Sequence, residues 1–208
     1  MSKVSSQKIE CPKCGEKSNF GIWDSVNVSA DPDLKEKVLN GDLFKFQCPK
    51  CHEETYVHYP CLYHDMEKLF MIYYLPNEQT EDEINKSMQP FLKYSKMYDG
   101  YKFRIVRDQN RLIEKVAVFD DLKDDMIIEA LKTVVAHNLS PEDVDKVRGL
   151  YYQGYDDEGI VYALIFDDVQ RGCIVPEEAY NEIKENNRFI YPDKFAEITE
   201  FTYQNYFK

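Results

Sequence analysis

A two-residue alternation of apolar and polar residues marks the first third of the chain. Such alternation is typical of strands with one buried face, and it predicts strands at Phe20–Val28, Leu43–Phe46 and Thr55–Tyr59. A continuous apolar run, Leu69–Leu75, ends at Pro76 and predicts a central strand. We therefore expect the first third of the chain to be mostly antiparallel β-structure.

One short helix should interrupt these strands between residues 31 and 41. Asp31 suits the N-cap, and Pro32 suits the first helical position because the N–H that proline lacks has no helical partner there. Gly41 suits the C-terminal cap, where a left-handed backbone is common.

The pattern changes after Pro76, where residues 76–83 are polar and acidic. Such stretches are typical of loops between compact regions. We therefore predict two domains, at 1–76 and 77–208.

The second domain is predicted to be α+β, with helices around one hairpin. Apolar residues recur there at helical spacing, and Asp156–Gly159 separates two strand-like runs. The predicted hairpin strands are Gly149–Tyr155 and Ile160–Phe166. The predicted helices are Glu81–Met97 with a bend or break at Pro90, one capped by Asp108, one with its apolar stripe at Ile127–Val135, one starting at Ser140, one starting at Pro176, and Phe195–Phe207.

Charge is distributed unevenly along the 208 residues. The chain carries 26 Lys and Arg against 38 Asp and Glu, a net charge of −12. Residues 77–208 hold 17 of the basic and 27 of the acidic residues, so this domain alone carries −10. Because an acidic surface repels phosphate backbones, nucleic acid would have to bind the first domain, where Lys13, Lys17, Lys45 and Lys50 are the candidates.

Two further features bear on where the protein works. No apolar run approaches the roughly 18 residues of a membrane helix, and the N-terminus is polar, without the apolar segment of a signal peptide. We therefore expect a cytoplasmic protein whose six cysteines stay reduced, as metal ligands or free thiols.

Four of the six cysteines form two matching pairs, which we call knuckles. Cys11-Pro-Lys-Cys14 and Cys48-Pro-Lys-Cys51 each have a spacer that lets both sulfur atoms face one point. Together they supply four thiolates, the ligand set of tetrahedral zinc, and four protein ligands leave no open position for catalysis. We therefore expect a structural Zn²⁺ at Cys11, Cys14, Cys48 and Cys51.

Two alternatives use the same residues. A single Cys-Pro-Lys-Cys could be a redox dithiol, but neither copy follows a strand and opens a helix, as such motifs do. A rubredoxin-like iron site has the same four ligands and remains the main competitor of zinc.

The 33 residues between the knuckles exceed the roughly 15–20 of an ordinary ribbon, because the predicted helix lies between them.

Other metal-like or acidic residues are weaker candidates. His52 stands where the first knuckle has Gly15, at a position that often needs positive φ, so we expect the second knuckle to be slightly opened. His58, Cys61 and His64 have metal-like spacing, but a half-buried cysteine between surface histidines explains them as well.

The acidic residues of the second domain offer the only candidates for catalysis. Asp120, Asp121, Asp124 and Asp125 could hold a divalent cation, although acids at a helix start also complement the helix dipole. Glu114 and Glu129 lie on helices expected to pack together and could form a carboxylate pair. No nucleophile motif or glycine-rich phosphate loop is present, so we name no catalytic residue.

The chain resembles the CpXC domain family, which is named for its two cysteine knuckles. The resemblance also covers several short motifs, and His52 and Cys61 depart from the expected pattern. It implies metal binding through the four cysteines and implies no particular activity. The matching motifs are Trp23–Val26, Asp31–Leu34, Gly41–Phe44, Tyr59-Pro60, Leu62–Met66, Leu112–Val116 and Asp124–Glu129.

These observations predict an α+β protein, with an antiparallel zinc-ribbon-like domain followed by an acidic α+β domain. Tyrosines at 151, 152, 155 and 162 crowd the predicted hairpin beside three acidic residues. This composition suits binding to a protein surface, including a basic one, although cross-strand aromatic packing explains it nearly as well. We expect a zinc-stabilised binding or accessory protein that recognises another protein. The alternatives are a nucleic-acid or transcription-associated ribbon and an enzyme that uses the carboxylates of the second domain.

Overall fold

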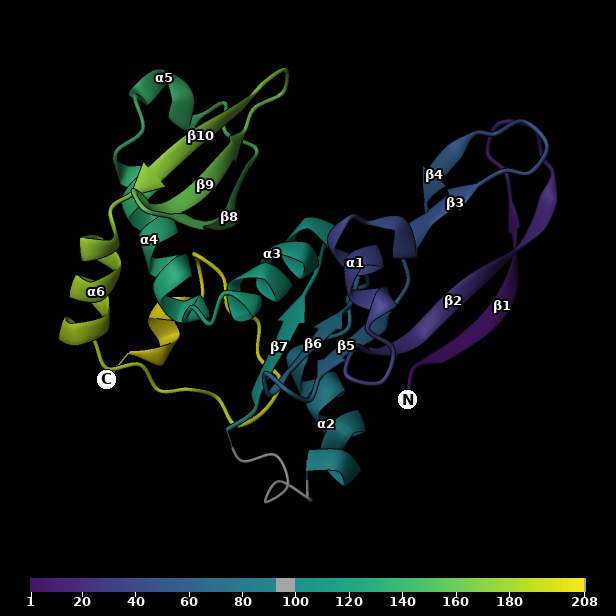
Figure 1. The fold of residues 1–208 in the computed structure, drawn as a ribbon, viewed down its shortest axis with the longest axis horizontal. Coiled ribbons are helices and arrows are strands. Elements are labelled where there is room, and N and C mark those ends of the chain that lie inside the picture. The colour runs from purple at the N-terminus through teal and green to yellow at the C-terminus, as the bar shows by residue number, and fades with distance from the viewer. Residues whose placement is uncertain (93–99, 208) are drawn as a thin grey trace. The chain divides into compact units, whose positions relative to one another are not determined.

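The computed structural model describes residues 1–92 and 100–207, and the chain divides into two compact units (Figure 1). The first unit comprises Met1–Ile113 and the second Glu114–Lys208. Both units contain helices and strands, which confirms the predicted α+β class. Among the described residues, no helix is long and apolar enough to cross a membrane.

The first unit is built on a five-stranded sheet in the order β1-β2-β5-β6-β7. Its elements are β1 (Lys3–Glu10), β2 (Lys17–Asn27), α1 (Asp33–Leu39), η1 (Asp42–Phe44), β3 (Lys45–Gln47), β4 (Glu54–Tyr56), β5 (Cys61–Asp65), β6 (Phe70–Tyr74), α2 (Glu81–Leu92) and β7 (Lys102–Val106). β3 and β4 form a separate two-stranded hairpin.

The expectation of mostly antiparallel β-structure holds for two of the four neighbouring pairs in this sheet and is wrong for the other two. β1 with β2 and β5 with β6 are antiparallel, but β2 runs parallel to β5 and β6 runs parallel to β7. A parallel pair needs a long crossover connection. The segment with α1 and the β3–β4 hairpin supplies the first crossover, and the segment with α2 supplies the second.

The division between the units lies beyond the domain boundary predicted after Pro76. β7 pairs with β6 along its whole length, from Phe70 opposite Lys102 to Tyr74 opposite Val106. A strand that continues a hydrogen-bond ladder belongs with the sheet that it extends. The division instead falls within helix α3 (Gln109–Asp120).

The second unit contains a three-stranded antiparallel sheet in the order β10-β9-β8. The predicted hairpin is confirmed, with Asp156 opposite Gly159 at its turn. Besides the end of α3, the elements of this unit are α4 (Asp125–His137), α5 (Pro141–Val144), β8 (Gly149–Asp156), β9 (Gly159–Ile165), β10 (Gln170–Val175), α6 (Glu177–Asn186) and η3 (Tyr203–Tyr206).

Helix ends in the first unit follow local chemistry only in part. Gly41 has the left-handed φ of 81° that its place after α1 predicts. The N-cap prediction for Asp31 is wrong, because α1 begins at Asp33 and the Asp31 carboxylate instead accepts a hydrogen bond from the Ser2 N–H at 3.2 Å. Of the two outcomes predicted at Pro90, a bend or a break, the break does not occur, since α2 continues to Leu92. The rest of the helix predicted to Met97 lies outside the described residues.

The helix predicted at Phe195–Phe207 is largely wrong, because only the short 3₁₀ helix η3 forms there. The side chain of Thr202 donates to the carbonyl of Glu197 at 2.6 Å and accepts from the N–H of Thr199 at 2.9 Å. Threonine side chains that bond to the nearby backbone compete with helical hydrogen bonds. This local competition accounts for the irregular chain before η3.

The unit boundary predicts the behaviour of fragments. Residues 1–113 with one equivalent of Zn²⁺ should fold cooperatively, whereas 1–76 should not, because β6 then loses its ladder with β7. Circular dichroism melts of the two fragments, with 108–208 as a third, measure this directly. A 1–76 fragment as stable as 1–113 would instead support the boundary predicted after Pro76.

Candidate metal centre

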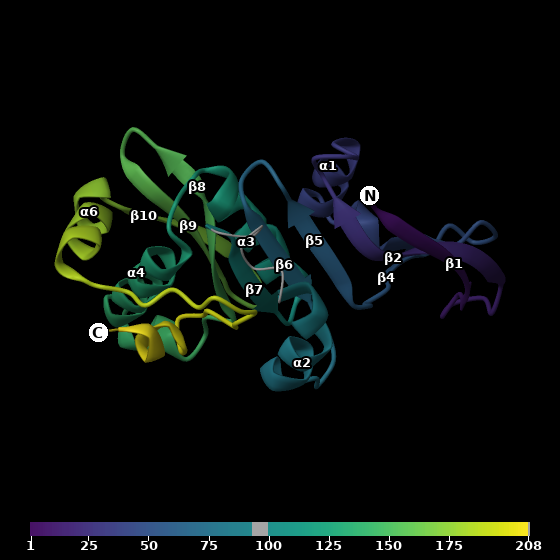
Figure 2. The same ribbon diagram turned by 90° about the horizontal axis from the view of Figure 1, so that it is seen from below.

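All four predicted ligands come together at one end of the first unit. The first knuckle lies in the loop between β1 and β2, and the second lies in the loop between β3 and β4. Figures 1 and 2 show these two loops side by side at the tip of their hairpins. The sulfur atoms of Cys11, Cys14, Cys48 and Cys51 all lie within 4.8 Å of one another, so the group could hold a metal ion.

The spacing of the sulfur atoms fits a tetrahedral ion. Cys11 Sγ lies 3.6 Å from Cys51 Sγ, and Cys14 Sγ lies 3.6 Å from Cys48 Sγ. Four sulfurs at ~2.3 Å from one tetrahedral ion would be about 3.8 Å apart. A disulfide would bring two sulfurs to roughly 2.05 Å, so these are separate thiols arranged around a common centre.

The two knuckles have the same backbone structure. In the first, the Cys11 N–H donates to the Glu16 carbonyl at 2.8 Å, and the Gly15 N–H donates to the Cys11 carbonyl at 3.0 Å. In the second, the Cys48 N–H donates to the Glu53 carbonyl at 2.9 Å, and the His52 N–H donates to the Cys48 carbonyl at 3.0 Å.

His52 does not open the second knuckle, so that expectation is wrong. Its N–H makes the turn-closing bond to Cys48, and its φ is 57°, close to the 72° of Gly15 at the equivalent position. A left-handed backbone costs a residue with a Cβ roughly 1–2 kcal/mol. His52 adopts this backbone conformation despite its cost, and the closed turn keeps the sulfurs of Cys48 and Cys51 in place.

The thiols influence one another's ionisation. The backbone N–H groups of Cys51 and Lys50 lower the pKa of Cys48 to about 7, against the effect of desolvation. For Cys14 the N–H of Glu16 lowers the pKa, but desolvation and hydrogen bonds with the other three thiols outweigh it and raise the pKa to about 12. The pKa of Cys51 is raised as well. Without a cation, some of the four thiols therefore keep their protons, and they must lose them to bind a metal as thiolates.

Reciprocal ion pairs join the two knuckles. Lys13 of the first knuckle pairs with Glu53 after the second at 2.8 Å, and Lys50 of the second pairs with Glu16 after the first at 3.3 Å. The same Cys-Pro-Lys-Cys-x-Glu order thus provides one cation and one anion from each side. Exposed pairs contribute little stability each, but both hold the loops in the same relative position.

All four lysines proposed for nucleic-acid binding have acidic partners. Besides the two pairs between the knuckles, Lys17 lies 3.3 Å from Glu10 and Lys45 lies 2.7 Å from Glu54. A lysine that must first leave a carboxylate is a weaker phosphate ligand than a free one. These four lysines therefore do not form a group of unpaired cations of the kind that a nucleic-acid ribbon uses.

The metal centre is connected to the rest of the first unit by a small apolar cluster. Phe46 packs with Cys11 and Cys48, and Phe20 lies against this cluster. The Phe20 ring is 5.9 Å from the Phe46 ring and 6.4 Å from the Tyr59 ring, both edge to face. This aromatic contact couples the knuckles to the residues that cover the sheet.

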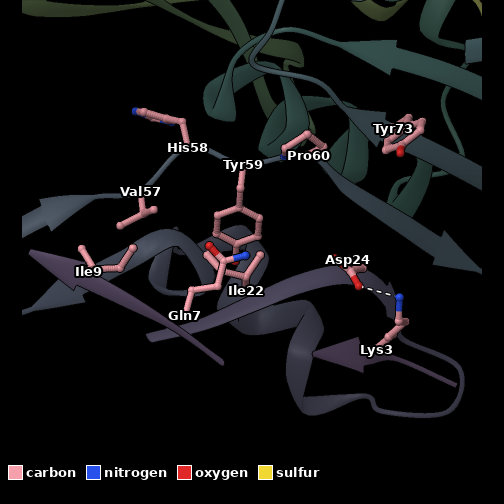
Figure 3. A pocket seen from close by; sticks show the side chains of 10 residues that line it. All are labelled: Lys3, Gln7, Ile9, Ile22, Asp24, Val57, His58, Tyr59, Pro60 and Tyr73. Atoms are coloured by element: carbon pink, nitrogen blue, oxygen red, sulfur yellow. Dashed lines mark ion pairs between the residues drawn. The ribbon is translucent and has the colours of Figure 1, made fainter. Parts of the chain in front are cut away.

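An open cleft of about 530 Å³ lies next to this cluster (Figure 3). Ile9 and Val57 contact the metal-site cluster and also line the cleft. Tyr59 and Ile22 line it further along, and at its far end Lys3 and Asp24 form an ion pair at 2.7 Å. Lys3 and Asp24 thus neutralise each other's charge in the cleft.

The residues considered for a second metal site are not gathered around one point. The ring of His58 hydrogen-bonds to the Tyr74 hydroxyl at 2.8 Å, and that of His64 to the Tyr101 hydroxyl at 3.1 Å. Cys61 is buried, and desolvation raises the pKa of its thiol to about 12. Over residues 1–92 and 100–207, the four knuckle cysteines are the one group with metal-ligand geometry.

The acidic residues at the start of α4 have separate structural roles. Asp124 is the N-cap of α4 and accepts from the Met126 N–H at 2.9 Å. Asp121 accepts a hydrogen bond from the Tyr152 hydroxyl at 2.7 Å. Asp125 is fully buried and pairs with Lys115 at 3.3 Å. The structure therefore separates the carboxylates that the sequence suggested as a cation site.

Glu114 and Glu129 do come together, but inside a buried chain of alternating charges. Lys132 lies 2.7 Å from Glu114 and 3.0 Å from Glu129, and Lys115 lies 2.9 Å from Glu129 and 3.3 Å from Asp125. Each of these side chains is at most 2% exposed. Burial raises the pKa of Glu114, although Lys132 opposes this. A carboxylate enclosed in this way is placed to hold α3 against α4 rather than to meet a substrate.

Comparison with known families agrees with the geometry of the knuckles. The family model described as CpXC protein matches residues 9–132, which is more than half of the chain. The chain belongs to the CpXC protein family. The matched region contains both knuckles and extends through α3 into α4, as far as Lys132. No curated protein and no solved structure matches the CpXC chain significantly.

The ionisation of the thiols predicts a pH-dependent affinity for metal. At pH 7 Cys14 and Cys51 carry protons, so binding of Zn²⁺ to the metal-free protein should release at least two protons per ion. Because protonation competes with the metal, the affinity should fall as the pH falls, by at least about 100-fold between pH 7 and pH 6. Calorimetric titration in buffers of different ionisation enthalpy measures both quantities.

Cys61→Ser is the matched control, because it removes a buried thiol outside the centre and should leave the proton release unchanged. An affinity for Zn²⁺ that is independent of pH in this range would contradict the four-thiolate site.

Proposed function

We propose that this CpXC protein is a cytoplasmic, zinc-stabilised binding protein that recognises another protein. The observation that carries the proposal is the closed set of four sulfur ligands beside four lysines that already pair with glutamates. The metal would shape the tip of the first unit, and the acidic second unit would supply much of the recognition surface.

The donor set supports zinc in a structural role. Four thiols and no carboxylate or imidazole form the group, and a tetrahedral tetrathiolate is typical of structural zinc. Iron can occupy the same ligand set and is the alternative for the metal. Either ion would bind only as long as the thiols stay reduced, which favours the cytoplasm.

Charge supports a protein partner over nucleic acid. Residues 114–208 hold 10 Lys and Arg against 21 Asp and Glu, a net charge of −11 out of −12 for the whole chain. The first unit is close to neutral, and its four candidate lysines pair with glutamates. A phosphate backbone would meet repulsion from one unit and neutralised lysines on the other.

The site geometry gives less support to an enzyme. Four protein ligands would fill the coordination sphere of the metal, so no position remains for a substrate or a water molecule. The carboxylate pair of the second unit is enclosed and already bound to two lysines. Binding by the surface of the protein is therefore the function that the structure favours.

The test is affinity purification of the full-length protein from its native host, followed by identification and quantification of what remains bound. We expect one protein in a near-stoichiometric amount, released at high salt, because recognition through an acidic surface is screened by ions. The same preparation should bind duplex or single-stranded DNA and RNA only weakly in gel-shift experiments at physiological salt. Recovery of nucleic acid without a protein partner would overturn the proposal.

A further inference from the structure

The turn that ends α3 contains an unusual residue, Leu122. The N–H of Leu122 donates to the Phe119 carbonyl at 3.2 Å, and the N–H of Lys123 donates to the Val118 carbonyl at 3.0 Å. These two bonds define a Schellman motif, whose left-handed position is usually glycine. Leu122 occupies that position with a φ of 55°.

Leu122 is unfavourable there for two independent reasons. A left-handed backbone is costly for a residue with a Cβ, and the Leu122 side chain is also exposed to water, with 82% of the residue accessible. Glycine would remove both costs without disturbing the hydrogen bonds of the turn. Leu122 therefore adds no stability to the isolated chain, whereas a partner that covers its side chain would bury apolar surface.

The two residues after Leu122, Lys123 and Asp124, contact three tyrosine side chains around the turn. The Lys123 ammonium lies 4.2 Å from the centre of the Tyr155 ring and 5.2 Å from that of Tyr180. The hydroxyl of Tyr180 accepts from the Asp124 N–H at 2.8 Å, and the hydroxyl of Tyr191 donates to the Asp124 carboxylate. Contacts from one short turn thus reach β8, α6 and the chain after α6.

Some of these aromatic rings are themselves exposed. Tyr155 is 54% and Tyr191 is 49% accessible. Together with Leu122 they provide three large apolar groups at the surface of the second unit, and the two tyrosines are held by Lys123 and Asp124. Tyrosine rings that such contacts already fix lose little entropy on binding, which suits them as anchors.

The charge around these groups is negative. Tyr155 is followed directly by Asp156, Asp157 and Glu158, all exposed at the β8–β9 turn. Glu177 lies 3.4 Å from Lys123 and neutralises its charge. A partner with arginines at its rim could pair with these carboxylates and stack on the tyrosine rings.

We propose that Leu122, Tyr155 and Tyr191 form the anchor of a docking surface for a basic protein. The partner presents an apolar hollow that takes Leu122, with arginine or lysine side chains around it that meet the carboxylates of the β8–β9 turn. This inference rests on the proposed function, in that it identifies the surface by which the chain recognises another protein.

The test places the photo-crosslinking residue p-benzoylphenylalanine at position 122 of the full-length protein in its native host. The matched control carries it at Leu69, which also has a left-handed backbone, with a φ of 57°, but lies in the first unit. We expect crosslinking to one protein at 122 and not at 69, through a surface rich in arginine or lysine. Failure to crosslink at 122, or equal crosslinking at both positions, would overturn the proposal.

Binding of the captured protein, once purified, is then measured by calorimetry. Leu122→Gly should weaken binding at least about tenfold while raising the melting temperature of the free chain, and Leu69→Gly should bind like the wild type. Asp157→Lys should also weaken binding, because it reverses one charge of the acidic rim. Wild-type affinity in Leu122→Gly would overturn the docking surface.

The two proposals can fail separately. A stoichiometric partner from affinity purification that binds Leu122→Gly as tightly as the wild type would exclude this surface and leave the proposed function standing. A chain that retains no protein partner at all would remove both.

Discussion

Four sulfur atoms about one point are the arrangement on which the first unit depends. The Cys11 and Cys51 sulfurs are only 3.6 Å apart, and so are those of Cys14 and Cys48. At this distance thiolates repel one another strongly unless a cation lies between them. The backbone prepares the site by closing both knuckles with matching hydrogen bonds, including the turn at His52. The chain thus tolerates a strained histidine and crowded thiols, and binding of a metal ion would offset both costs.

A second costly arrangement lies in the core of the second unit. Five charged side chains alternate in sign between α3 and α4, and their carboxylates and ammonium groups are almost completely buried. Removing one partner from such a chain leaves an unpaired buried charge, which typically costs several kcal/mol. The network therefore fixes how these helices pack, and it explains why Glu114 and Glu129 are close together without forming an open site.

Much of this structure could be predicted from the chain, and the failures share a cause. The paired knuckles, the hairpin at β8–β9 and the left-handed Gly41 after α1 depend on neighbours within a few residues, so local patterns predict them. β1 and β10 have weak apolar alternation and are strands because of their partners. The parallel β6–β7 pair and the pairing of Lys13 with Glu53 join distant residues. Leu122 gave no signal in the sequence, because its cost comes from a backbone angle.

The central claim is that Cys11, Cys14, Cys48 and Cys51 together bind one metal ion. X-ray absorption spectroscopy at the zinc edge of the purified full-length protein tests it most directly. The account predicts one ion per chain with four sulfur neighbours at ~2.3 Å and no nitrogen or oxygen in the coordination sphere. A sphere that contains a histidine nitrogen or a water oxygen, or protein purified under reducing conditions without any bound metal, would contradict it.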